Sequence, residues 1–187
     1  MAESEKLASE PGPFGFLSRR RLLKYGLLGG SVLLMGGAGG LLSLRGFAPE
    51  VRGLRILSAH EYRTLTALAR THLPAGGAFP TGAKDFDIAR QFDDFLADEP
   101  EDNIRDLKRA LMLLEFGPVL FERKAKTFSN LSPKEQLRHW ESWMLSPMLL
   151  RRQVSTAFRK FISLVFYDLE KVWPHIGYPG PALGVRR

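Results

Sequence analysis

After residue 54, apolar side chains recur at the three- and four-residue spacing of amphipathic helices. The strongest stripe covers residues 150–169 and indicates a helix in the centre of a bundle. Its members are Leu150, Val154, Ala157, Phe158, Phe161, Ile162, Val165, Phe166 and Leu169. No stretch alternates between apolar and polar residues for long enough to require a sheet. The pattern predicts an all-α fold, an irregular bundle of about five helices.

Serine and proline residues mark where these helices begin. Ser58 with Glu61 three positions later, and Ser132 with Glu135, have the spacing of capping boxes, in which serine and glutamate satisfy free backbone N–H groups. Ser146 before Pro147 predicts a third start of this kind. We expect helices from Ser58 to Leu73, from Asp85 to Ala97, from Pro100 to a kink or break at Gly117-Pro118, from Ser132, and from Ser146.

The four helices before the last one are expected to turn their apolar residues inward. These residues are Tyr62, Leu65, Leu68, Ala69 and His72; then Ile88, Phe92, Phe95 and Leu96; then Ile104, Leu107, Leu111 and Leu114; then Leu137, Trp140 and Met144. Residues 74–84 hold two prolines and three glycines and are expected to form a loop.

The first 48 residues have the layout of an export signal. The motif SRRRLLK, formed by Ser18, Arg19, Arg20, Arg21, Leu22, Leu23 and Lys24, precedes 20 residues without a charge, Tyr25 to Leu44. It differs from the twin-arginine consensus only at Leu22, where phenylalanine is usual. The uncharged run holds seven glycines, each costing a helix about 1 kcal/mol relative to alanine, which disfavours a soluble-domain helix. We predict a twin-arginine signal or anchor over residues 1–48 and a helical domain over 49–187.

Two fates of this leader stay open. Gly46-Phe47-Ala48 is the best small-x-small cleavage site, but the following Pro49 is unfavourable just after a cut. The uncharged run is also long enough to cross a bilayer. The expected location is periplasmic or otherwise outside the cytoplasm, with anchoring to the inner membrane as the alternative to cleavage.

The formal net charge of +7 does not indicate a nucleic-acid-binding protein. There are six Lys/Arg residues against three Asp/Glu up to Ala48, and 21 against 17 from Pro49 onward. The basic residues of the second part are interspersed with acids, as in EDNIRDLKRA, which is typical of solvated helix faces. A basic stripe interleaved with stacking aromatics is missing.

Residues suited to catalysis or metal binding do not converge in the sequence. Cysteine is absent, which excludes disulfides, thiolate metal sites and covalently attached c-type haem in this chain. The four histidines, each expected to be a surface or half-buried structural residue, are His60, His72, His139 and His175. A cluster of acids lacks the spacing of an EF-hand and is expected to form a solvated face; its members are Asp93, Asp94, Asp98, Glu99, Glu101 and Asp102. We predict no catalytic, cofactor-binding or metal site in this chain.

The segment VWPHIGYPGPALG, residues 172–184, combines large apolar groups with three prolines and three glycines. In one interpretation this Pro/Gly-rich extended tail folds back and seals the bundle, with Trp173 and Tyr178 as plugs. In the other it is a rigid turn that presents aromatic anchors to a partner. The residues expected to make that contact are Trp173, Ile176, Gly177, Tyr178, Pro179, Gly180 and Pro181.

Four features in this order resemble subunit 3, the small subunit, of gluconate 2-dehydrogenase and related membrane-bound sugar and alcohol dehydrogenases. They are the twin-arginine leader, the opening helix LSAHEYRTLTALARTHLPA, the restart LSPKEQ and the closing WPHIGYPGP, and they span nearly the whole chain. The closing motif is the most specific of these features for the family, whereas the helix starts alone would be weak evidence for it. The resemblance implies a non-catalytic accessory subunit of an oxidoreductase complex.

The same resemblance implies partners that carry the chemistry. The large one is an FAD-dependent dehydrogenase of the glucose-methanol-choline type, which often lacks its own export signal and would cross the twin-arginine translocase on this chain's leader. A multihaem cytochrome c that passes electrons to the quinone pool is a further partner that the resemblance allows. Two alternatives stay open: a self-sufficient exported helical enzyme, and a membrane-anchored helical scaffold without a redox partner.

Overall fold

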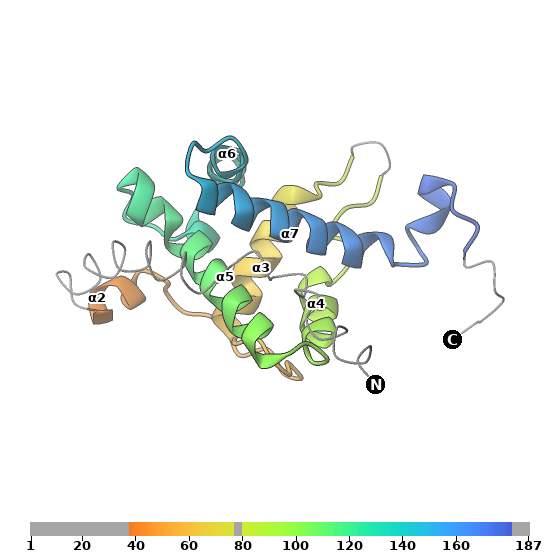
Figure 1. Cartoon of the computed structure of the whole chain (residues 1–187), viewed down its shortest axis with the longest axis horizontal. Helices are drawn as coiled ribbons and strands as arrows, with labels where there is room; N and C mark the ends of the chain where they lie inside the picture. Colours follow the sequence, from red (N-terminus) through yellow and green to blue (C-terminus); the bar gives the residue numbers. More distant parts are fainter. Residues whose placement is uncertain (1–37, 77–79, 181–187) are drawn as a thin grey trace, which may run out of the picture.

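The computed structural model describes residues 38–76 and 80–180, and these residues form helices and irregular segments without a strand (Figure 1). The long helices are α3 (Ala59–His72), α4 (Ile88–Leu96), α5 (Glu101–Glu122), α6 (Pro133–Met144) and α7 (Leu149–Tyr167). Three short elements accompany them: α2 (Ala38–Ser43), η1 (Phe128–Asn130) and η2 (Trp173–Ile176). The predicted all-α fold with about five helices is confirmed.

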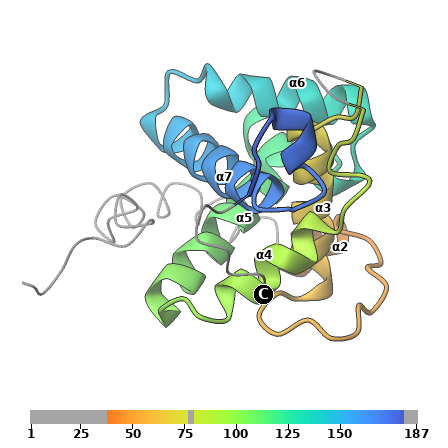
Figure 2. The ribbon, with the colours of Figure 1, turned by 90° about the vertical axis from the view of Figure 1, so that its right-hand side faces the viewer.

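Helix α3 lies at the centre of the bundle and packs against α4, α5, α6 and α7. Two of its leucines, Leu65 and Leu68, are completely buried. Helix α7 packs against α4 and α6, and Figures 1 and 2 show it crossing α3 along one side of the molecule. Its predicted stripe is buried from Val154 to Phe166, while the opposite face of the helix stays open to solvent.

The capping predictions hold for two helices and fail for the third. The Ser58 N–H donates to the Glu61 carboxylate at 2.8 Å, and Ser132 donates to Glu135 through both its N–H and its hydroxyl group. Ser146, in contrast, is not the cap of α7, which begins at Leu149. The buried Ser146 hydroxyl accepts the Met148 N–H group at 3.2 Å and so shapes the connection between α6 and α7.

Of the kink or break predicted at Gly117-Pro118, the break does not occur, because helix α5 continues through Pro118. Proline removes one helical hydrogen bond, but here it lies only four residues before the helix end, and the surrounding turn is buried. Gly117 is also needed for packing, since a Cβ atom there would lie 2.6 Å from Nε2 of His139 on α6. Arg123, in the left-handed conformation with φ 55°, then ends the helix.

The inner faces of two helices differ from the prediction. Leu137 is 45% exposed, whereas α6 turns His139 and Trp143 inward beside the predicted Trp140. Phe95 lies at the surface of α4, although its ring still contacts Phe161 at a centroid distance of 6.1 Å. Both differences follow from the direction in which the neighbouring helices approach, which the spacing of apolar residues does not encode.

Candidate functional site

The C-terminal turn, residues Trp173–Gly180, folds mainly on itself. The Trp173 indole N–H donates to the Tyr167 carbonyl, and the Tyr178 N–H donates to the Trp173 carbonyl, both at 3.0 Å. The two aromatic rings meet edge to face with centroids 5.2 Å apart. Gly180, at φ 100°, lies against the indole, where a Cβ atom would be 3.3 Å from the ring. The turn is therefore a preformed unit.

This turn projects beyond the end of α7, on the right in Figure 1 and toward the viewer in Figure 2. Val172, just before it, is completely buried and joins the core, whereas Trp173 is only half-buried. Ile176 is 43% exposed and Tyr178 44% exposed. Trp173 and Tyr178 thus pack on each other at the end of α7.

Several predicted site residues cannot be placed. Pro181 and the whole export motif, Ser18 to Lys24, lie outside the described residues. Of the uncharged run, the structure describes only the part from Ala38 onward, which includes α2. Within residues 38–76 and 80–180, no helix combines the length and the hydrophobicity needed to cross a membrane.

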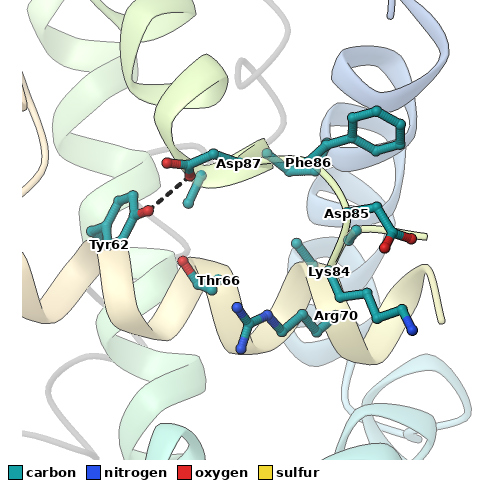
Figure 3. A pocket seen from close by; sticks show the side chains of 11 residues that line it. Tyr62, Thr66, Arg70, Lys84, Asp85, Phe86 and Asp87 are labelled. Carbon is teal, nitrogen blue, oxygen red and sulfur yellow. Dashed lines mark hydrogen bonds between the residues drawn. The ribbon is translucent and has the colours of Figure 1, made fainter. Parts of the chain in front are cut away.

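A hollow of about 260 Å³ lies between α3 and the segment before α4 (Figure 3). The Tyr62 hydroxyl donates to Asp87 at 2.8 Å, and burial together with this bond raises the pKa of Tyr62. Asp87 also accepts the Arg90 N–H at the start of α4, and Asp85 accepts the Gly82 N–H at 2.8 Å. These carboxylates therefore act in the local fold.

His139 is fully buried, whereas the histidines were expected at the surface or half-buried. Its Nδ1 atom bonds to the Glu122 carboxylate, and its Nε2 atom is buried against Gly117 without a hydrogen-bond partner. Burial lowers the pKa of His139, although Glu122 acts in the opposite direction. The pair connects the end of α5 to α6. The described residues contain no group of three potential metal ligands.

Two buried acids, whose burial the sequence did not predict, stabilise the fold by accepting hydrogen bonds. Asp93, expected on a solvated face, is fully buried and accepts the backbone N–H groups of residues 55, 56 and 57 at 2.6, 3.0 and 2.6 Å. Glu115 is buried as well and accepts from the Thr64 hydroxyl and from the N–H and hydroxyl of Ser129. In the sequence, the only indication that these acids are buried was that each one adjoins apolar residues on a predicted inner face.

An apolar groove of about 770 Å³ follows the open face of α7. Its apolar lining comes from Met144, Leu149, Ala157, Phe161 and Leu164, and Arg152 and Lys160 flank it. Leu149 and Leu164 fall outside the predicted stripe, so the spacing of apolar residues did not indicate this groove.

Comparison with known proteins identifies no relative of this chain. No family model matches it, and no match exists among curated proteins or among solved structures.

Proposed function

We propose that this chain is the non-catalytic small subunit of an exported, FAD-dependent sugar or alcohol dehydrogenase complex, similar to subunit 3 of gluconate 2-dehydrogenase. In this role it binds the folded flavoprotein and accompanies it through the twin-arginine translocase. The observation that carries the proposal is the C-terminal turn, in which the motif most specific for the resemblance forms a self-closed projection with exposed apolar side chains.

The physical properties of the turn suit it to binding a partner. Its hydrogen bonds and its ring contact order it before any partner arrives, so little conformational entropy is lost on association. Exposed Ile176 and Tyr178 then offer the apolar and aromatic contacts that dominate many interfaces. The groove along α7 supplies further apolar surface on the helix that carries the turn.

The acids and histidines of the body support an accessory role over a catalytic one. Asp87, Asp93 and Glu115 bind backbone or hydroxyl groups that position helices. His139 and Glu122 bind each other between α5 and α6. In this proposal the flavin and the substrate belong to the dehydrogenase, and a cytochrome c partner would take its electrons.

Purification of the tagged full chain from its native host tests the proposal. We expect a complex that contains about one flavin per chain and reduces an artificial acceptor when a sugar, sugar acid or alcohol is supplied. Trp173→Ala with Tyr178→Ala should lower the flavin content, whereas Arg70→Ala on the exposed side of α3 should leave it unchanged. A colourless, monomeric chain would contradict the proposal and favour the scaffold alternative.

Export is tested separately. Arg19→Lys with Arg20→Lys should leave both this chain and the flavoprotein in the cytoplasm, because lysine does not reproduce the planar donors of arginine. Fractionation followed by immunoblotting measures both proteins. Export of the flavoprotein in a strain that lacks this chain would show that the leader serves this chain alone.

A further inference from the structure

One end of the bundle exposes an unusual number of large apolar side chains. This leader-side face consists of Leu42, Phe47, Phe121, Leu145, Met148 and Leu149. Phe47 is 84% exposed and Leu145 is 85% exposed, the highest values among the large apolar residues of the described chain. Isolated apolar residues are common on protein surfaces, but several at one end indicate a contact surface.

Ring contacts connect the three segments that form this face. The Arg45 guanidinium lies over the Phe116 ring at 5.0 Å and joins the segment after α2 to α5. The Arg151 guanidinium lies over Phe121 and Trp143 at 5.0 and 5.2 Å and joins α7 to α5 and α6. Figure 1 shows α2, the end of α5 and the connection between α6 and α7 at the left, opposite η2.

The charge of the leader-side face is basic. Arg123, Lys126 and Arg152 are exposed there, while Lys124 pairs with Glu122 and Glu135. Two exposed acids lie close to these residues in the chain, Glu50 after Phe47 and Glu141 on α6, and further exposed acids, including Asp94, Asp98 and Glu101, lie at the connection between α4 and α5. Apolar side chains beside arginine and lysine are the composition of surfaces that bind anionic membranes.

The chain that leads to this face is fixed to the body. Arg63 on α3 donates to the Phe47 carbonyl at 2.6 Å and also to the Arg45 carbonyl. The Asn130 amide donates to the carbonyls of Leu44 and Arg45, each at 3.0 Å. The uncharged run of the leader ends at Leu44, so its end has a defined position relative to the body.

We infer that the leader-side face lies on the surface of an anionic phospholipid bilayer. The fixed segment at residues 44–47 turns this face toward the headgroups, where Arg123, Lys126 and Arg152 contact phosphate groups. Phe47, Leu145 and Met148 enter the boundary between headgroups and acyl chains. The C-terminal turn, at the other end of α7, then points away from the membrane and stays open to a protein partner. The inference needs no flavoprotein.

A fluorescent probe at a single cysteine tests this orientation. The chain has no cysteine, so Leu145→Cys introduces a unique labelling site, and Glu170→Cys beyond the far end of α7 is the matched control. The labelled full chain is reconstituted into vesicles of phosphatidylethanolamine and phosphatidylglycerol that carry a spin-labelled quencher near the headgroups. We expect the probe at position 145 to lose most of its emission and the probe at 170 to keep it.

Each other outcome overturns the inference or part of it. Equal emission at positions 145 and 170 would place the leader-side face away from the bilayer. Protection of position 145 only after a dehydrogenase subunit is added would make this face a protein interface instead. Equal quenching in phosphatidylcholine vesicles would remove the role assigned to the basic residues. Because the measurement uses no flavoprotein, its failure is distinct from failure of the proposed function.

Discussion

Two irregular segments flank the helical body, and they are held in opposite ways. Side chains of the body bind the backbone of the N-terminal arm, residues 44–57. Arg63, Arg90, Asn130, Lys108 and Asp93 provide these contacts. The C-terminal turn is closed by its own backbone, with the Trp173 indole bound to the end of α7 and Val172 buried before it.

The N-terminal arm is therefore part of the fold, whereas the C-terminal turn is an appendage to it. Backbone groups need hydrogen-bond partners, and the arm obtains many of them from side chains of the body, of which Asp93 binds three N–H groups. Loss of those side chains should therefore unfold or release the arm. The turn satisfies its groups locally, so changes in it should affect a partner more than the body. The following predictions test this contrast, from the largest effect to the smallest.

Asp93→Ala should cause the largest loss of stability. Three buried or partly buried N–H groups of the arm would lose their acceptor, which should lower the free energy of unfolding by about 3 kcal/mol or more. Urea unfolding of the full chain in mild detergent measures this. Asp94→Ala, at the exposed neighbouring position, is the control and should change stability by about 0.5 kcal/mol or less. Equal effects would mean that Asp93 does not fix the arm.

Arg63→Ala should have an intermediate and more local effect. Its guanidinium joins the carbonyls of Arg45 and Phe47 to Ser129, so its loss should cost about 1–2 kcal/mol and expose residues 44–47 to proteases. Limited proteolysis followed by mass spectrometry locates the cuts, with Arg70→Ala on the same helix as control. Cleavage of residues 44–47 at the wild-type rate would show that other contacts hold the arm.

Trp173→Ala should cost the body about 1 kcal/mol, the size of an edge-to-face aromatic contact. The same change should weaken retention of the dehydrogenase strongly, because the turn loses the ring on which Tyr178 packs. Thermal unfolding and flavin content of the purified complex measure the two effects, with Lys171→Ala as the control. A stability loss of about 3 kcal/mol with an intact complex would make the turn a seal of the bundle.

Acid should loosen the N-terminal arm slightly while leaving the C-terminal turn unaffected. Burial, and then the charges of Arg45 and Arg63, lower the pKa of His60 below its usual 6.5. The unfolded chain therefore takes up this proton first, so stability present above pH 6.5 is lost as the pH falls toward the lowered pKa. The hydrogen-exchange protection factors at residues 45–48, which correct for the intrinsic pH dependence of exchange, should fall over this interval, and His60→Gln should suppress the fall. A similar fall at residues 173–178 would contradict a local cause.

Much of the helical body could be predicted because its signals are local. Capping at Ser58 and Ser132, the start of α5 after Pro100 and the buried stripe of α7 each depend on residues within one or two turns. The helix does not break at Pro118, one of the two outcomes predicted there, because burial of the same turn outweighs the missing hydrogen bond. Local sequence preferences therefore determine which helices form, and packing determines where some of them end.

The sequence by itself determined the helices, the absence of cysteine chemistry and the segment that closes the chain. Only the tertiary structure decided which polar groups are buried and which apolar groups remain outside. Asp93 meets backbone groups 36 to 38 positions earlier in the chain, a distance over which a residue pattern carries no information. The leader-side face likewise combines residues from α2, α5 and the start of α7, brought together by helices that pack around α3. Which residues are buried and which are exposed depends on that three-dimensional packing. Helix formation depends mainly on residues within neighbouring turns of the same segment.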